Sequence, residues 1–234
     1  VDPFVVEIGS NDGSMLKNFS RKNIRHLGIE PSSNVAEEAR KHGVNTLCSF
    51  FNLTTAKKIA SEHGYADALI AANVMCHIPD LHGLAQGIDH LLNPMGVLVF
   101  EEPYLGDMIK NTAYDQIYDE HVYIFSVHSV INIFSKHGFE LINIKPQSTH
   151  GGSMRYILAR KGKRAVSPSV EKQLHYEDKN NLHIRSTYDL FREKCELSRK
   201  DLVSILQQQK NDGRRVVGYA ATSKSTTVLN YCGI

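Results

Sequence analysis

The chain contains 234 residues, 41% of them hydrophobic, which is enough to bury the core of one large domain or of one domain plus a smaller unit. Its net charge of +2 excludes a strongly basic nucleic-acid-binding surface, and the sequence lacks the apolar run of about 18 residues that would span a membrane. Four cysteines far apart, without a C-x-x-C pair, and the lack of a signal-peptide pattern predict reduced thiols and a cytoplasmic location.

Strand and helix patterns alternate through residues 1–161. Short β-branched and apolar runs predict seven strands, at residues 4–8, 27–30, 44–48, 66–73, 96–101, 139–144 and 154–160. Amphipathic patterns bounded by capping residues predict helices at residues 14–20, 34–42, 54–63, 81–92 and 129–137. This alternation favours a doubly wound, Rossmann-like α/β sheet that is mainly parallel and ends in an antiparallel hairpin.

The composition changes near Lys161, where the chain becomes charged and helical. Its apolar side chains then recur at helical spacing and predict a packing surface, formed by Ile184, Tyr188, Phe191, Cys195 and Leu202. The pattern of residues 215–225 predicts another strand, a loop and the start of a helix. We therefore expect a core domain at residues 1–161, a helical linker at 162–213 and the start of a second α/β unit at 214–234.

The most informative pattern is EIGSNDG at residues 7–13, a turn between the first strand and the first helix. Gly9 and Gly13 stand where the backbone would pass close to a ligand. Glu30 follows Gly9 by 21 residues and ends the second strand, a spacing at which an acid can hold both hydroxyls of a ribose. Glu7 disfavours a pyrophosphate beside this turn and favours a cation.

The spacing E-x-G-x-x-x-G resembles motif I of class I S-adenosylmethionine-dependent methyltransferases. This resemblance implies S-adenosylmethionine as the cofactor, and the alternative is a glycine turn in some other α/β protein. The cofactor-binding residues that we expect follow the first, second and fourth strands: Glu7, Gly9, Asn11, Gly13, Glu30 and Asn73.

Two further segments could carry chemistry. Asn73 and His77 follow the fourth strand, so the fold would deliver them beside the glycine turn, although His77 could equally be a helix-entry residue. A long connection after the fifth strand carries Tyr118, Glu120 and His121, and a histidine oriented by a carboxylate is a good general base near neutral pH. The alternative is a solvated acidic turn. A third spaced ligand is lacking, so we expect no metal site.

Several segments together resemble the nucleotide-sugar C-methyltransferases, including the 3-C-methyltransferases of branched deoxysugars. They are EIGSNDG, NVMCHIPD, YDEHVYIFS, GGSMR, and VVGYAATSK with LNYCGI. Members of that family usually have a four-cysteine zinc domain, a methyltransferase core and a C-terminal α/β domain. The resemblance therefore implies zinc only where such an N-terminal domain exists, and we expect this chain to lack that domain and most of the C-terminal one.

The resemblance also implies roles for individual residues. His121 would be the base of a Glu-His pair with Glu120, and Tyr118 would lie near the substrate. Asn73 and His77 would line the sugar pocket, and Lys224 would face the nucleotide-sugar portion; its alternative is an exposed lysine at a helix start.

The expected activity is carbon methylation of a nucleotide-linked keto-deoxysugar, in which His121 forms an enolate that takes the methyl group. A methyltransferase acting on oxygen or nitrogen of another small metabolite remains an alternative. So does a non-catalytic module that binds S-adenosylmethionine or a nucleotide sugar. We expect no nucleic-acid or membrane partner, and the sequence leaves the oligomeric state open.

Overall fold

The computed structural model describes residues 2–219 and 222–234. Its centre is a seven-stranded sheet in the order β3-β2-β1-β4-β5-β7-β6. The strands are β1 (Phe4–Ile8), β2 (Arg25–Ile29), β3 (Thr46–Leu47), β4 (Ala66–Ala72), β5 (Leu92–Pro103), β6 (Phe139–Gln147) and β7 (Ser153–Arg160). β7 pairs antiparallel with both β5 and β6, and the other pairs are parallel, as the sequence predicts.

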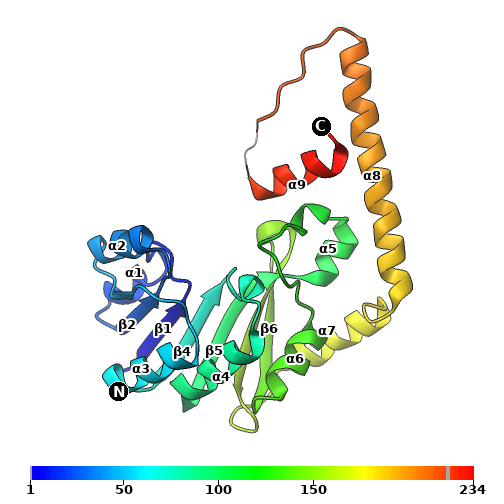
Figure 1. Ribbon diagram of the computed structural model, residues 1–234. Helices are drawn as coiled ribbons and strands as arrows, with labels where there is room; N and C mark the ends of the chain where they lie inside the picture. Colours follow the sequence, from blue (N-terminus) through cyan, green and yellow to red (C-terminus); the bar gives the residue numbers. More distant parts are fainter. Residues whose placement is uncertain (1, 220–221) are drawn as a thin grey trace.

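Helices cover both faces of this sheet (Figure 1). Nine α-helices lie in the described residues: α1 (Lys17–Ser20), α2 (Ser33–Lys41), α3 (Leu53–His63), α4 (Leu81–Leu91), α5 (Leu105–Asn111), α6 (Val127–Ser135), α7 (Pro168–Lys179), α8 (Arg185–Asn211) and α9 (Ser223–Cys232). Three 3-10 turns join them: η1 (Met75–His77), η2 (Tyr114–Gln116) and η3 (Thr149–Gly151). On one face, α3, α4, α6 and α7 lie side by side, and α1 and α2 cover the opposite face.

Local details differ from the sequence prediction at element ends. The first helix is shorter than predicted, because a 3-10-like turn occupies residues 14–16, and the third strand keeps only two paired residues. α5 was not predicted, since its seven residues make up only two turns of helix. Residues 215–219 make no strand pairing, although α9 follows them as expected. Residues 220–221 of the predicted strand-loop-helix start lie outside the described part of the chain.

The predicted linker is joined to the core at its first helix. Val170 of α7 belongs to the main hydrophobic core, and Glu177 is fully buried. The Glu177 carboxylate accepts hydrogen bonds from Tyr104 Oη (2.9 Å) and from the backbone N–H groups of Val127 (2.6 Å) and His128 (3.0 Å). These contacts fix α7 to the N-terminus of α6, and the chain extends away from the sheet from α8 onward (Figure 1).

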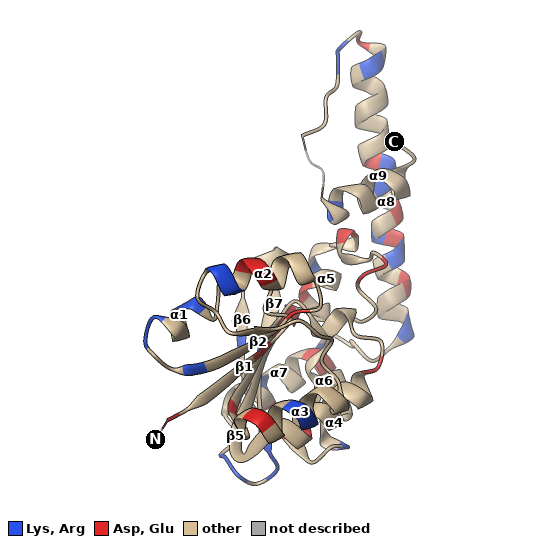
Figure 2. Cartoon of the chain, turned by 60° about the vertical axis from the view of Figure 1, so that its left-hand side comes forward, with Lys and Arg blue, Asp and Glu red and all other residues tan. Residues whose placement is uncertain are grey.

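α8 carries a narrow apolar contact and a broad charged surface. Phe191 and Cys195, both on the predicted stripe, are buried with Met108 of α5, and Tyr231 of α9 packs against them. The remaining surface of α8 alternates positive and negative side chains (Figure 2), and three ion pairs form along it at i,i+3 or i,i+4 spacing. Within residues 2–219 and 222–234, none of the helices has the length and apolar character that crossing a bilayer requires.

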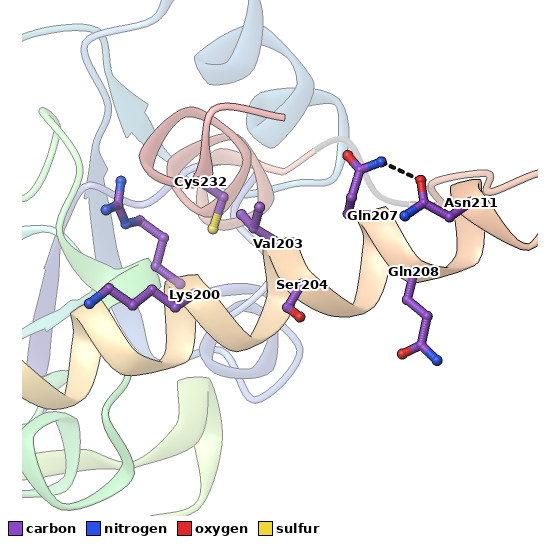
Figure 3. Close-up of a pocket in the computed structure, with 8 residues that line it drawn as sticks. Lys200, Val203, Ser204, Gln207, Gln208, Asn211 and Cys232 are labelled. Atoms are coloured by element: carbon purple, nitrogen blue, oxygen red, sulfur yellow. Dashed lines mark hydrogen bonds between the residues drawn. The ribbon is translucent and has the colours of Figure 1, made fainter.

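A groove of about 610 Å³ lies between α8 and α9 (Figure 3). Val203 and Cys232 form its apolar floor, and Gln207 donates a hydrogen bond to Asn211 at its rim (2.8 Å). Its lining contains amides and the stems of basic side chains but neither a carboxylate nor an imidazole. Among the described residues, those singled out from the sequence gather elsewhere.

Candidate functional site

A cavity of about 820 Å³ lies at the carboxyl ends of β1, β2 and β4. Parallel strands end at one edge of the sheet, and ligands of open α/β sheets bind at that edge. The cavity brings together six of the residues predicted from the sequence: Glu7, Gly9, Asn11, Glu30, Asn73 and His77. Gly13 stands behind the cavity wall instead of lining it.

The two motif glycines adopt left-handed backbone angles, with φ of 68° at Gly9 and 77° at Gly13. A Cβ atom on Gly9 would overlap a methyl group of Val74, and one on Gly13 would lie 2.8 Å from Cγ2 of Val44. The motif predicts that these glycines make room for a ligand. In the structure the space beside each glycine is filled by a valine, so they shape the turn and its packing.

Glu30 is a fixed, buried carboxylate at the end of β2. Its Oε2 accepts from the backbone N–H of Asn11 (3.0 Å), and its Oε1 accepts from that of Ser32 (2.9 Å). Each carboxylate oxygen can accept a second hydrogen bond. Glu30 therefore faces the cavity with two acceptors at a fixed spacing, which fits the vicinal hydroxyls of a ribose.

Glu7 and Asn73 place unpaired polar atoms at the cavity wall. Among the residues that the structure describes, neither Glu7 Oε2 nor Asn73 Oδ1 has a hydrogen-bond partner, although both are buried. Burial raises the pKa of Glu7 to about 8, and the nearby Asp12 carboxylate adds to this rise. Buried acceptors without donors are costly. A ligand bearing an ammonium group would satisfy them, which fits the amino acid portion of S-adenosylmethionine.

The segment after β4 is held by a carboxylate that the sequence patterns did not single out. Glu102 of β5 is fully buried, and its Oε1 accepts from the backbone N–H groups of Val74 (2.9 Å), Met75 (2.7 Å) and Cys76 (3.4 Å). Burial raises the pKa of this carboxyl. Glu102 thus fixes the turn that presents His77 to the cavity.

The environment of His121 makes one of its nitrogens a base. Nδ1 lies 2.8 Å from the backbone oxygen of Gln116, and Nε2 lies 2.8 Å from Tyr118 Oη. A carbonyl only accepts, so the hydrogen of the neutral ring stands on Nδ1 and Nε2 accepts from Tyr118. Burial lowers the pKa of His121, and the nearby His77 and Lys224 lower it further, which favours the neutral ring near pH 7.

The Glu-His pairing implied by the resemblance stays a prediction, because another group holds the His121 ring in this structure. No hydrogen bond joins Glu120 to His121 in the described part of the chain, and the Gln116 carbonyl occupies the orienting position. Glu120 and Tyr118 instead line an adjoining, more open cavity of about 1060 Å³ that reaches the N-terminus of α9. His77 lines the main cavity, and its ring centroid lies 5.3 Å from that of His121.

Lys224, predicted on the substrate side, lies at the first turn of α9. Its Nζ is 3.3 Å from Nδ1 of His150, a residue of η3 that lines the main cavity. The structure therefore brings Lys224 to the same region as the other predicted residues. The sequence patterns did not point to His150 as a site residue.

A possible donor set for a metal also occurs here. One ligand atom each of Cys76, His77 and His121 lie within 4.8 Å of one another. Burial and the Glu102 carboxylate raise the pKa of the Cys76 thiol far above its usual range, so no thiolate is ready to bind. Both nitrogens of His121 are already hydrogen-bonded. The donor set fits a metal ion poorly.

The sequence analysis did not identify three residues of this site, for related reasons: Glu102, Gln116 and His150. Each acts through a contact with a residue distant in the chain. Only Glu102 carried a usable signal, because it stands at the carboxyl end of a predicted strand, where site residues gather. Gln116 and His150 occupy loops without a motif or a spacing.

Comparisons with known proteins agree with this geometry. The family model described as "Methyltransferase domain" matches residues 2–144, and the one described as "C-methyltransferase C-terminal domain" matches residues 148–234. The chain is 32% identical over 231 residues to C-methyltransferase NovU of Streptomyces niveus. The match covers 98% of this chain and 55% of that protein, so the chain spans about half the length of this curated relative.

Solved structures share the fold at low sequence identity. A methyltransferase from Anabaena variabilis, which is S-adenosylmethionine-dependent, superposes with a TM-score of 0.55 at 17% identity, over 68% of this chain and 77% of that one. The magnesium protoporphyrin IX methyltransferase ChlM of Synechocystis was solved with bound S-adenosylhomocysteine. It superposes with a TM-score of 0.50 at 16% identity, over 67% of this chain and 73% of that one.

The fold is therefore that of the class I S-adenosylmethionine-dependent methyltransferases. Within that class, the chain belongs to the family described as "Methyltransferase domain", whose model matches more than half of it, and its remaining residues match the C-terminal domain of C-methyltransferases.

Proposed function

We propose that this protein transfers the methyl group of S-adenosylmethionine to the carbon next to the ketone of a nucleotide-linked keto-deoxysugar. The observation that carries the proposal is the neutral His121, whose Nε2 is a base beside the cofactor cavity. Carbon methylation needs such a base, because a C–H bond must lose its proton before the carbon can attack. The ketone makes that neighbouring C–H bond acidic.

Each side chain has a defined task in this reaction. Bound S-adenosylmethionine supplies an electrophilic methyl group. Glu30 holds the ribose hydroxyls, and Glu7 accepts from the ammonium group. His121 takes the substrate proton on Nε2 after the Tyr118 hydroxyl moves aside, and the Gln116 carbonyl stabilises the imidazolium through Nδ1–H. Holding the two substrates in line supplies much of the rate enhancement.

Deuterium exchange tests the proposal without methyl transfer. The full-length protein is incubated in D2O with thymidine, uridine or guanosine diphosphate 4-keto-6-deoxyhexoses in the absence of S-adenosylmethionine, and the label beside the ketone is followed by NMR. We expect exchange with one of these sugars above the rate in buffer. Methylation of an oxygen or nitrogen atom would proceed without such exchange, so its absence with every sugar, in a protein that methylates one of them, would refute the proposal.

Glu7 makes a pH-dependent prediction for cofactor binding. An ammonium group beside Glu7 favours its ionised form, so binding of S-adenosylhomocysteine should lower the pKa of Glu7 from about 8 and release a proton near pH 7. Affinity should therefore rise with pH up to about 8.

The stability of the ligand-free protein should change with pH in the opposite direction. The folded state holds the Glu7 proton more tightly than the unfolded state, so the contribution of Glu7 to stability is lost as pH rises from 4.5 to about 8.

Calorimetry in two buffers of different ionisation enthalpy measures the released proton. Glu7→Gln is the matched control, because it keeps the shape and removes the titration. We expect this variant to bind S-adenosylhomocysteine more weakly, to release no proton and to unfold at a higher temperature than the wild type at pH 8. Equal binding enthalpies for the wild type in both buffers would show that Glu7 does not meet the ammonium group.

A further inference from the structure

His150 lies at the tip of the turn between β6 and β7 and is held in an unusual conformation. Its φ is 55°, a left-handed value that is uncommon outside glycine. The Gln116 side chain donates to its carbonyl (2.6 Å), and the flanking residues are fixed as well: Thr149 Oγ1 donates to Glu101 (3.1 Å), and Asn111 donates to the Gly151 carbonyl (3.0 Å). Strain that is held in place in this way clusters at functional sites.

Lys224 fixes the tautomer of the His150 ring. Its Nζ lies 3.3 Å from His150 Nδ1, and an ammonium group can only donate. Nδ1 therefore accepts, and the ring hydrogen stands on Nε2. Burial and Lys224 both lower the pKa of His150, so the ring is neutral near pH 7. His150 lines the main cavity, so its ring offers an Nε2–H donor in that region, polarised by the adjacent ammonium group.

The buried Gln116 ties this ring to the proposed base. Its backbone carbonyl accepts from His121 Nδ1 (2.8 Å), and its side-chain amide holds the His150 backbone. The two imidazoles therefore have opposite tautomers, because His121 has its lone pair on Nε2 and His150 has its hydrogen there. Lys224 also lowers the pKa of His121, which places the ammonium within electrostatic range of both rings.

Deprotonation next to a ketone needs a donor as well as a base, since negative charge develops on the ketone oxygen. His150 lines the cavity that contains the expected cofactor residues, whereas Tyr118 lines the other, more open cavity. We propose that His150 donates its Nε2–H to the ketone oxygen of the substrate and that Lys224 strengthens this donor. This inference rests on the proposed function and names the electrophilic residue of that same site.

The step balances without another reactant. The C–H electron pair moves to form the enolate as the proton passes to His121 Nε2, and the charge on oxygen is held by the hydrogen bond from His150. The enolate electron pair then forms the new C–C bond to the methyl group, the S–CH3 bond of S-adenosylmethionine breaks with its electron pair left on sulfur, and S-adenosylhomocysteine and the restored ketone result. The proton on His121 leaves to solvent, and His150 keeps its own hydrogen throughout, as expected of a neutral imidazole donor.

Deuterium exchange at saturating 4-keto-6-deoxyhexose nucleotide, in the full-length protein, tests this role. We use His150→Asn, because asparagine tolerates the left-handed angle but ends short of the Nε2 position. Loss of one such donor typically costs about 10²–10³-fold in rate, and we expect a decrease of that size in the exchange rate. His150→Gln, whose amide N–H reaches closer to the Nε2 position, should recover part of the rate. Lys224→Met should lower the exchange rate less than His150→Asn does. Lys179→Met, on the exposed surface of α7, is the control and should leave the rate unchanged.

Nitrogen-15 spectra of the histidines provide a readout independent of turnover. We expect His150 to be protonated on Nε2 and His121 on Nδ1, and we expect Lys224→Met to weaken this preference at His150 only. Wild-type exchange that survives unchanged in His150→Asn, or a His150 ring protonated on Nδ1, would overturn the role of His150 and leave the proposed function intact. A wild type that methylates a sugar without exchange would overturn the function itself.

Discussion

The His121→Asn variant is expected to lose turnover by about 10²–10⁴-fold, the usual cost of removing a general base. The loss should appear in the rate of deuterium exchange as well as in methyl transfer, because the variant lacks the nitrogen that takes the proton. S-adenosylhomocysteine affinity should stay the same, since His121 does not line the cavity that holds Glu7 and Glu30. Exchange kinetics by NMR and calorimetry on one preparation measure both effects.

Glu120→Gln is the informative control for this experiment. Because the Gln116 carbonyl orients His121, removing the Glu120 charge should change the exchange rate little. A large loss in Glu120→Gln would show that the carboxylate turns toward the ring when substrate binds. An exchange rate in His121→Asn equal to that of the wild type would move the base elsewhere, with His77 and Tyr118 as the next candidates.

The Glu102→Ala variant is expected to destabilise the fold by about 3 kcal/mol, because it leaves backbone donors of the turn after β4 without their shared acceptor. Cofactor affinity should fall with it, since Val74 of this turn packs against Gly9. Urea denaturation gives the free energy of unfolding, and calorimetry gives the affinity. Glu102→Gln keeps the side-chain volume and an acceptor oxygen and should lose much less stability. Equal losses in the two variants would show that an acceptor oxygen at this place does not account for the stability of the turn.

The sheet could be predicted from the sequence because its signals are local. Each strand is a short apolar run bounded by turn residues, and the alternation of strands and helices determines the layers. The shorter α1 and the two-residue β3 were beyond such reasoning, since pairing with neighbours sets where a short element ends. α5 is similar, because seven residues are too few for a periodic pattern to stand out, and its apolar side chains pack against α8.

The site residues likewise divide into those with a local sequence signal and those without one. Motif spacing along consecutive strands predicted three of them from the sequence: Glu7, Gly9 and Glu30. The orientation of His121 by a backbone carbonyl leaves no trace in residue identity, so the adjacent Glu120 was assigned the orienting role. His150 and Lys224 meet across 74 positions of sequence, and only the folded hairpin and α9 bring them together.

The contact between Gly9 and Val74 has a consequence for how this family can change over time. A side chain at position 9 would collide with the valine, and the left-handed backbone of the turn disfavours any residue there except glycine. Drift at position 9 is therefore blocked twice, whereas position 74 is free to become smaller but not larger. We expect the two positions to behave as one inherited unit among related sequences, with glycine retained at position 9 wherever a β-branched residue occupies position 74.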